Sequence, residues 1–258
     1  MARNNTNMEP AKNKLIIALD VDTVARARQL VAQLRDIAGM FKVGSQLFTA
    51  AGPDFVREII GGGNKVFLDL KFHDIPNTVA SAAIEATRLG VSIFNVHALG
   101  GSEMMERTAH AVAETASKEQ LSKPAVIAVT LLTSANEATL GEIRIDAKPE
   151  ELVTRLARMA ARAGLDGVVA SAAEASIIRS ATTPDFLIVT PGVRPSGAVA
   201  ADQKRIATPR EAVERGADYV VVGRPILESP DPVKAATQIV EEINAVSSGS
   251  RKSSEYDL

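Results

Sequence analysis

The stretch "KVFLDLKFHDIPNTV", residues 65–79, begins as an apolar strand and then places ionisable side chains almost side by side. Four of them follow the apolar run 66–68 without a break: Asp69, Lys71, His73 and Asp74. One charged residue at a strand end is ordinary, but four within six positions, ahead of a Pro-Asn-Thr turn, need a reason. The apolar half of the stretch indicates the fold, and the charged half indicates the site.

Seven other apolar, β-branched runs resemble residues 65–71 and bring the number of candidate strands to eight. They are residues 15–20, 40–45, 92–98, 125–132, 167–171, 186–192 and 219–224. Amphipathic segments lie between them; for example, Val24, Ala27, Leu30 and Leu34 share one helical face. The connection from Ser171 to Phe186 is short and predicts a brief helix. Near-continuous apolar runs are typical of a parallel sheet buried on both faces.

Eight strand–helix units in 258 residues predict an α/β fold, a single-domain (β/α)₈ TIM barrel. No Pro/Gly/Ser-rich linker interrupts the units. A doubly wound open sheet is the alternative, which periodicity alone does not exclude. We expect the barrel to span residues 14–246, with flexible polar tails at 1–13 and 247–258.

Composition restricts the possible partners and compartment. Hydrophobic residues make up 46% of the chain and charged residues 23%, enough for a large core and a solvated surface. A net charge of −2 argues against general affinity for nucleic acid or anionic membrane, so any phosphate site must be local. The chain has no cysteine, which excludes disulfides and thiolate chemistry. Without a signal peptide or an apolar run of about 20 residues, a cytoplasmic location is expected.

A TIM barrel carries its functional residues at the C-terminal ends of its strands. Polar and charged residues collect at these ends in the sequence: Asp20, Lys42, Asp69, Lys71, His97, 130–134, 191–194 and 223–224. Residues two apart on a strand share a face, so Asp69 and Lys71 are expected about 6.6 Å apart at Cα, close enough to pair. Lys42 and Asp20 end neighbouring strands and can reach the same pocket.

A structural ion-pair network is the simpler interpretation of any one of these charges. For the whole set it is unfavourable, because removing several charges from water is costly and is rarely repaid by stability alone. The set therefore favours a ligand site.

These motifs resemble those of the orotidine 5′-monophosphate decarboxylase family. "FLDLKFHDIPNTV" resembles the family signature, and "ALD", "FKVG", "NVHA", "VTLLTS", "VTPGVRP" and "VVGRPI" follow the family's order across residues 15–244. The Asp-x-Lys-x-x-Asp core alone is shared with related barrel enzymes. The combination is what makes the resemblance specific.

The resemblance implies removal of CO₂ from orotidine 5′-phosphate to give uridine 5′-phosphate, the last step of de novo pyrimidine synthesis, without metal or cofactor. It implies that Lys71 protonates C6 of the ring and stabilises the carbanion, and that Asp69 lies beside the departing carboxylate. Lys42 and Asp74 would complete the charge array. In the family, the second Asp of the motif comes from the other subunit, which implies a homodimer with shared active sites.

The resemblance also implies the substrate-binding residues. Asp20 and Lys42 would bind ribose hydroxyls, and Thr78 would come from the same neighbouring segment as Asp74. The others are Thr133 and Ser134 at the pyrimidine, and Pro191, Arg194, Gln203, Gly223 and Arg224 in the loops after strands seven and eight. Those loops often bind phosphate in barrels, and arginine offers fork-shaped donors for it.

The three histidines, His73, His97 and His110, lack the spacing of a usual metal site, and structural hydrogen bonding is the favoured role for each.

The nearest rival function is a metal-dependent sugar-phosphate decarboxylase or aldolase of the same superfamily. As a family, those enzymes place an acidic metal ligand where this chain has Lys42. A Schiff-base aldolase needs a lysine kept neutral by burial, against which the acidic neighbours of Lys71 argue. A non-catalytic barrel would not require the full charge array.

Overall fold

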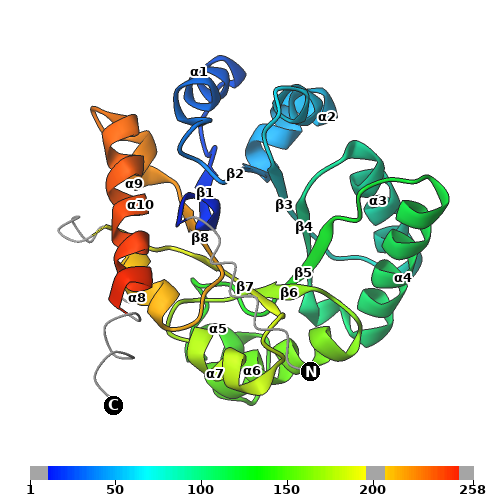
Figure 1. The fold of residues 1–258 in the computed structure, drawn as a ribbon. Coiled ribbons are helices and arrows are strands. Elements are labelled where there is room, and N and C mark those ends of the chain that lie inside the picture. The colour runs from blue at the N-terminus through cyan, green and yellow to red at the C-terminus, as the bar shows by residue number, and fades with distance from the viewer. Residues whose placement is uncertain (1–10, 196–206, 250–258) are drawn as a thin grey trace, which may run out of the picture.

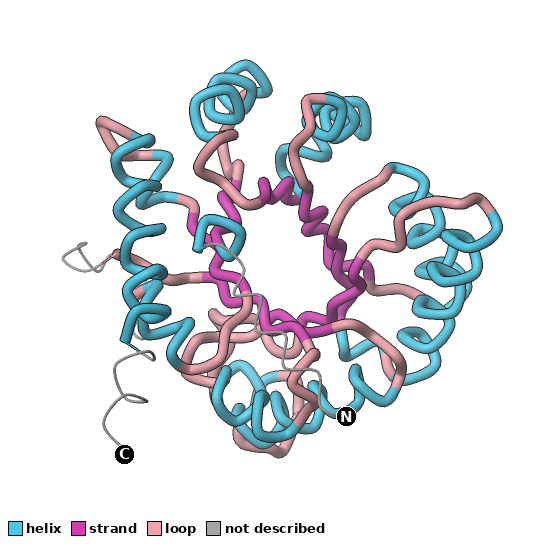
Figure 2. Tube along the Cα trace, in the orientation of Figure 1, coloured by secondary structure: helices cyan, strands magenta, loops and turns pink. Residues whose placement is uncertain are grey.

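The computed structural model describes residues 11–195 and 207–249 of the chain. Eight parallel strands pair in chain order into a closed barrel, and β1 pairs with β8. The strands are β1 (Leu15–Ala18), β2 (Met40–Gly44), β3 (Val66–Phe72), β4 (Ile93–His97), β5 (Ala125–Val129), β6 (Gly167–Val169), β7 (Leu187–Pro191) and β8 (Tyr219–Val222). Figure 2 shows them as a ring inside the helices. The predicted (β/α)₈ barrel is confirmed, and the closure excludes the open-sheet alternative.

All eight strands fall on the predicted runs, although most end earlier than the apolar pattern does. The run at 125–132, for example, is strand only as far as Val129. Only β3 extends past its predicted end, to Phe72. The extra residues at the other strand ends leave the sheet ladder and form the loops of the site.

The helices surround the barrel as an outer layer (Figure 1). In the described residues they are α1 (Val24–Leu34), α2 (Ser45–Gly61), α3 (Pro76–Leu89), α4 (Ser102–Lys118), α5 (Glu137–Glu142), α6 (Pro149–Arg162), α7 (Ala175–Ala181), α8 (Pro209–Glu214), α9 (Arg224–Leu227) and α10 (Pro232–Gly249), with 3₁₀ turns η1 (Ala11–Lys14) and η2 (Ala98–Gly100). The connection before β7 holds the brief helix that was predicted, α7. α2 is kinked at Gly52, which has a φ of 65° and precedes Pro53.

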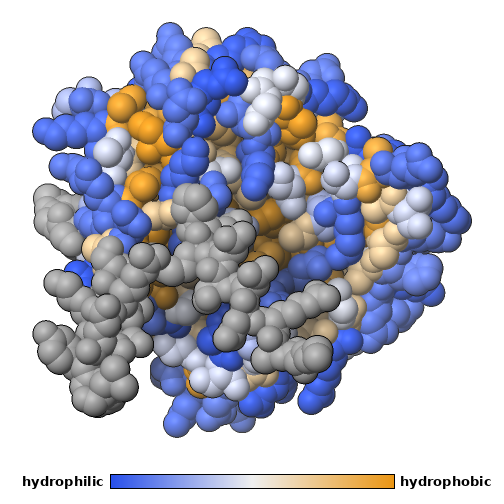
Figure 3. Space-filling model, viewed as in Figure 1, coloured by the Kyte–Doolittle hydropathy of each residue, from blue (hydrophilic) through white to orange (hydrophobic). Residues whose placement is uncertain are grey.

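Two apolar cores lie on opposite sides of the sheet because side chains alternate along each strand. The inner core fills the barrel with Ile16, Ala18, Met40, Phe67, Ile93, Ile127, Val189 and Val221. The outer core packs the other face of the strands against the helices, and includes Leu15 and Ile17 of β1. On the face shown in Figure 3, hydrophilic side chains cover the outer helices and hydrophobic ones lie between them.

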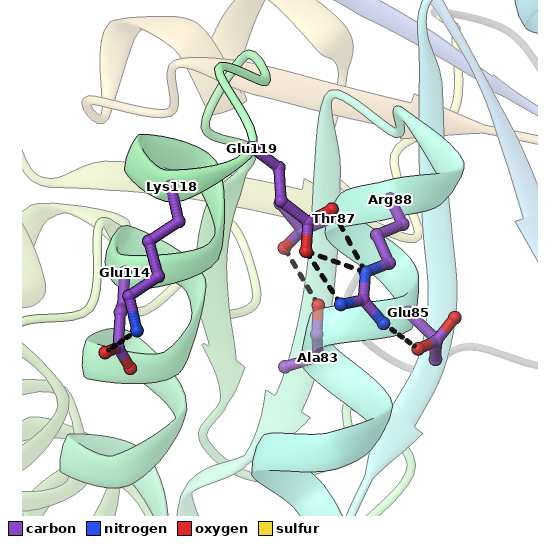
Figure 4. Close-up of polar contacts among 7 residues, drawn as sticks. All are labelled: Ala83, Glu85, Thr87, Arg88, Glu114, Lys118 and Glu119. Atoms are coloured by element: carbon purple, nitrogen blue, oxygen red, sulfur yellow. Dashed lines mark hydrogen bonds and ion pairs between the residues drawn. The ribbon is translucent and has the colours of Figure 1, made fainter.

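Polar clamps fix the helix layer. The Arg88 guanidinium of α3 lies between Glu85 and Glu119, 2.7 Å from an oxygen of each, and joins the end of α3 to the end of α4 (Figure 4). Arg179 of α7 donates to the carbonyl oxygens of Phe186 and Gly216 and to Asp218. These contacts hold the segments that lead into β7 and β8. In the described part of the chain, no helix combines the length and apolar character needed to cross a membrane.

Candidate active site

A cavity of about 310 Å³ opens at the C-terminal ends of the strands. Small-molecule pockets are typically about 300–1,000 Å³. The predicted site residues that line the cavity are Asp20, Lys42, Asp69, Lys71, Thr133, Pro191, Arg194, Gly223 and Arg224. The barrel thus brings together side chains from the ends of β1, β2, β3, β7 and β8 and from the loop after β5.

Three predicted residues that the structure describes do not line this cavity. Ser134 is exposed beside Thr133, and Asp74 and Thr78 are exposed at the start of α3. An oxygen of Asp74 accepts the backbone N–H of Ile75 at 2.6 Å, and the structure records no ion pair for Asp74 among the described residues. Gln203 lies outside the described residues.

Four side chains form a line of alternating charge across the cavity. Lys42 Nζ is 2.9 Å from Asp20 Oδ1 and 3.2 Å from Asp69 Oδ2. Lys71 Nζ is 2.6 Å from Asp69 Oδ1. The side chains of Lys42 and Asp69 are 10% and 13% exposed, whereas that of Asp20 is 54% exposed. The two central charges are therefore mostly shielded from solvent, and the outer ones face the opening.

Burial and pairing act in opposite directions on the two central groups. Burial would lower the pKa of Lys42, but the charges of Asp69 and Asp20 outweigh it and the pKa is raised. Burial would raise the pKa of Asp69, but the charges of Lys42 and Lys71 and the hydrogen bonds from Lys71 and Asn95 leave it lowered. Both groups are held in their ionised forms, so the cavity carries fixed charges at neutral pH.

Glycine makes room for this array next to Lys42. A Cβ at Gly44, two residues further along β2, would lie 3.1 Å from Lys42 Nζ and 3.3 Å from Asp20 Oδ1. These contacts are tighter than side chains normally make, so a larger residue would crowd the pair. In the motif "FKVG", Lys42 therefore supplies a charge, and Gly44 leaves the space that its ammonium and Asp20 occupy.

The backbone of β3 is irregular at the lysine. β3 and β4 pair regularly at Leu68 and Phe94, and the register has shifted by the next pair, Phe72 and Val96. Within this irregularity Lys71 adopts a φ of 52°, in the left-handed region. Its N–H donates to the side-chain oxygen of Asn95 at 2.8 Å. From the sequence, Asn95 was identified only as the first residue of the motif "NVHA" and was given no role, although an amide beside apolar residues of β4 was a visible signal.

The cavity has an apolar floor and a cationic side. Ala18, Phe67 and Val221 line its base and also belong to the inner core of the barrel. Arg194, which is 8% exposed, and Arg224 line the side formed by the ends of β7 and β8. A ligand with an anionic end and a flat apolar body would match both surfaces.

The histidines near the site pack on each other. The rings of His73 and His97 are stacked, with centroids 5.3 Å apart and planes at 20°. His97 Nδ1 accepts the N–H of Leu99 at 3.3 Å. Burial, followed by the charges of His73 and Lys71, lowers the pKa of His97. This contact agrees with the structural role predicted for His97.

Known proteins resemble this chain along nearly its whole length. Residues 13–239 match the family described as orotidine 5′-phosphate decarboxylase / HUMPS. The orotidine 5′-phosphate decarboxylase of Syntrophotalea carbinolica is 58% identical over 235 residues, 91% of this chain and 96% of the relative. That of Geobacter sulfurreducens is 55% identical over 92% of this chain and 98% of the relative.

Solved structures agree with the sequence relatives. The crystal structure of orotidine 5′-phosphate decarboxylase from Lactobacillus acidophilus is similar with a TM-score of 0.79 and 38% identity, covering 89% of this chain and 98% of that one. The corresponding protein from Pyrococcus horikoshii OT3 gives a TM-score of 0.71 at 27% identity, covering 89% and 99%. With the family match, these relatives show that the chain belongs to the orotidine 5′-phosphate decarboxylase / HUMPS family.

Proposed function

We propose that this protein converts orotidine 5′-phosphate to uridine 5′-phosphate and CO₂, the last step of de novo pyrimidine synthesis, and that it does so without metal or cofactor. The observation that carries the proposal is the line of alternating charge Asp20–Lys42–Asp69–Lys71 inside a barrel-end cavity. The relatives that bear the name of this activity match this chain over 96–98% of their own length.

The proposed chemistry needs fixed charges. When the bond from C6 to the carboxylate breaks, CO₂ leaves and the electron pair stays on C6, where no neighbouring carbonyl can delocalise it. Preorganised charge can stabilise such an anion without a cofactor. In this proposal the Lys71 ammonium stabilises the carbanion and then donates its proton to C6.

The two other central charges have supporting roles. In this proposal Asp69 lies beside the substrate carboxylate, and the repulsion between them is relieved as CO₂ departs. Lys42 holds Asp69 ionised and, with Asp20, binds the ribose hydroxyls. The lowered pKa of Asp69 supports this assignment, because the carboxylate stays charged at neutral pH.

The remaining substrate contacts are proposed from the family resemblance, and most of the residues concerned line the cavity. We assign the phosphate to Arg194, Gly223 and Arg224, with Gln203 as a further proposed contact, and the pyrimidine to Thr133 and Ser134. Pro191 also lines the cavity and is a further proposed substrate contact. Because Ser134 does not line the cavity, its proposed contact with the pyrimidine would require a shift of its loop.

The test is incubation with orotidine 5′-phosphate in the presence of EDTA, following the loss of the orotate absorbance. We expect full activity with the chelator and none from Lys71→Ala prepared in parallel. Activity that EDTA abolishes and Mg²⁺ restores would instead support the metal-dependent sugar-phosphate decarboxylase or aldolase. The position of Lys42 argues against that rival, since its ammonium lies between two carboxylates that a metal would need.

We also propose that the enzyme is a homodimer in which Asp74 and Thr78 enter the partner's active site. Both are exposed and lie outside the cavity of their own chain. Between them Ile75 is 67% exposed, and Leu99 of η2 is 40% exposed. Exposed apolar side chains beside polar ones of expected function fit a surface that a second copy covers.

Mixed dimers test the shared site. Lys71→Ala and Asp74→Ala homodimers should both be nearly inactive. After unfolding, equal mixing and refolding, about half the dimers are mixed, and one site in each is intact, so activity should recover to about a quarter of wild type. A mixture of Lys71→Ala with Lys42→Ala is the matched control and should stay inactive, because both changes damage the chain's own site. No recovery in an exchanged Lys71/Asp74 mixture would place Asp74 in its own chain's site.

The compartment and other partners are proposed on composition alone. A chain without cysteine and with a net charge of −2 suits a reducing cytoplasm and gives no general attraction to nucleic acid or anionic membrane. Fractionation of the source cells, with the decarboxylase assay on each fraction, tests the location.

A further inference from the structure

Asn95 is a buried amide between two apolar residues of β4. It lies in the middle of β4, is 1% exposed, and has Phe94 and Val96 as its neighbours along the chain. A carboxamide placed there requires hydrogen-bond partners, because unpaired polar groups are costly to bury. Both of its partners belong to the charged segment of β3.

Asn95 uses both ends of its carboxamide. Its Oδ1 accepts the backbone N–H of Lys71 at 2.8 Å, and its Nδ2 donates to Asp69 Oδ1 at 2.7 Å. The same Asp69 oxygen accepts from Lys71 Nζ at 2.6 Å. One side chain therefore contacts the backbone of the lysine and the carboxylate that binds the ammonium of that lysine.

The strand requires such a contact at this point. The register of β3 against β4 shifts between Leu68 and Phe72, so the N–H of Lys71 binds a side chain where a regular strand would bind backbone. Residues other than glycine rarely adopt a φ like the 52° of Lys71. Such a strained backbone conformation persists only where contacts with neighbouring residues hold it. This left-handed conformation sets the direction in which the lysine side chain leaves the strand.

We propose that Asn95 is a positioning residue of the reaction: it holds the left-handed backbone of Lys71 and the carboxylate of Asp69 so that the ammonium is aimed at the reacting carbon. The inference rests on the proposed decarboxylation and deepens it. Asn95 does not line the cavity, so it acts through Lys71 and Asp69. No other uncharged side chain of this length offers both a planar acceptor and a donor.

Two substitutions separate this role from simple packing. Asn95→Leu keeps the approximate volume and removes both hydrogen bonds; kcat should fall about 100-fold, the loss expected for a misplaced reacting group, while KM changes little. Asn95→Asp keeps the acceptor for the Lys71 N–H but turns the donor into an oxygen that faces Asp69. Two such carboxylates share a proton more readily as the pH falls.

Asn95→Asp should therefore be rescued by acid. Relative to wild type at the same pH, its kcat should rise about tenfold or more between pH 8 and pH 5, as a proton restores the donor toward Asp69. The titratable groups that face this position are Asp69 and Lys71 on β3, Lys42 on β2 and His97 on β4 itself. The same groups are present in both proteins, so a difference between the two pH profiles reports the carboxylate pair that the substitution creates with Asp69.

Thr108→Val serves as the stability-matched control. The buried Thr108 hydroxyl of α4 donates to the Met104 carbonyl at 2.7 Å, and neither residue lines the cavity. This substitution removes a buried hydrogen bond and should leave kcat unchanged. An Asn95→Leu protein that is folded and has kcat within about twofold of wild type, or an Asn95→Asp loss that is constant with pH, would overturn the inference.

A crystal structure of Asn95→Leu gives a readout that does not depend on activity. We expect Lys71 to return to a negative φ once its N–H partner is gone. If Lys71 keeps its left-handed conformation, Asn95 does not hold it and the inference fails. If the wild-type chain does not act on orotidine 5′-phosphate, the proposed function fails, whereas this structural comparison still decides what Asn95 does.

Discussion

Replacing Lys42 by methionine should destabilise the fold as well as the site. Lys42→Met removes the ammonium 3.2 Å from Asp69 Oδ2 and 2.9 Å from Asp20 Oδ1 and keeps most of the apolar stem. The side chain of Asp69 is 13% exposed, so water replaces the lost partner poorly, whereas Asp20 is 54% exposed and remains solvated. The main cost therefore falls on Asp69.

The magnitude follows from what Asp69 keeps. Breaking a buried ion pair by removing one partner costs about 3–5 kcal/mol. Oδ1 of Asp69 still accepts from Lys71 and Asn95, which places the loss at or below the lower end of that range, about 2–3 kcal/mol. The contact with the half-exposed Asp20 adds less than about 1 kcal/mol. For a chain of this size, the total corresponds to a fall in Tm of about 5–10 °C.

The loss should depend on pH with a defined sign. The pKa of Asp69 is lowered by folding from its ordinary value of 3.8, so its stabilising effect is present above that value and disappears as the pH falls through the folded-state pKa. Without Lys42 this lowering is reduced. The difference in stability between wild type and Lys42→Met should thus be largest near neutral pH and shrink below about pH 4.

Urea denaturation at a fixed chain concentration measures the difference. Lys118→Met is the matched control, since Lys118 pairs with Glu114 at 2.6 Å on the surface of α4 with 71% of its side chain exposed, and its loss should be close to the experimental error (Figure 4). Adding Asp69→Asn to Lys42→Met should recover part of the stability. A loss for Lys42→Met no larger than that for Lys118→Met, or one that is as large at pH 3 as at pH 7, would refute the reasoning.

Three further substitutions test separate parts of the structure. Lys71→Ala should abolish turnover and leave the circular dichroism spectrum unchanged, because one ammonium both stabilises the carbanion and supplies the proton; near-normal kcat would assign the proton elsewhere. Arg224→Ala should lower kcat/KM for the phosphorylated substrate, whereas the control Arg210→Ala on α8 should not. Added phosphite should partly restore the turnover of a substrate that lacks phosphate. Equal losses of kcat/KM on the phosphorylated and unphosphorylated substrates would show that Arg224 does not bind phosphate. Arg179→Ala should cost about 2–3 kcal/mol of unfolding free energy with kcat unchanged, because its carbonyl partners lose a buried donor; unchanged stability in urea would show that this clamp contributes little.

The barrel could be predicted from the sequence because its signal is repeated eight times. Each apolar run and each amphipathic segment independently favours the same parallel architecture. In a parallel barrel the C-terminal ends of all the strands lie at the same end of the barrel, which predicts where the site residues gather. The pairing of Asp69 with Lys71 also followed from strand alternation, and the structure has their charged atoms 2.6 Å apart. These features depend on local periodicity, which the sequence records directly.

The irregular features of the site could not be predicted in the same way. Alternation assumes a regular strand, but β3 shifts register before Phe72 and Lys71 turns left-handed. The partner that accommodates this, Asn95, is 24 residues away from Lys71 along the chain. Ser134 was predicted with Thr133 from the family resemblance, yet only Thr133 lines the cavity, since neighbouring residues in a turn point in different directions.

The floor of the cavity is also the top layer of the barrel core, and this couples substrate range to folding. Ala18, Phe67 and Val221 are in both sets. Evolution or engineering that trims Phe67 to admit a bulkier ring would also hollow the core, and large-to-small changes of buried aromatic residues cost about 3–5 kcal/mol. Most folds have only about 5–15 kcal/mol in reserve. New specificities in this scaffold are therefore more accessible through substitutions in the loops after β5, β7 and β8, which can change the volume of the cavity without removing atoms from the barrel core.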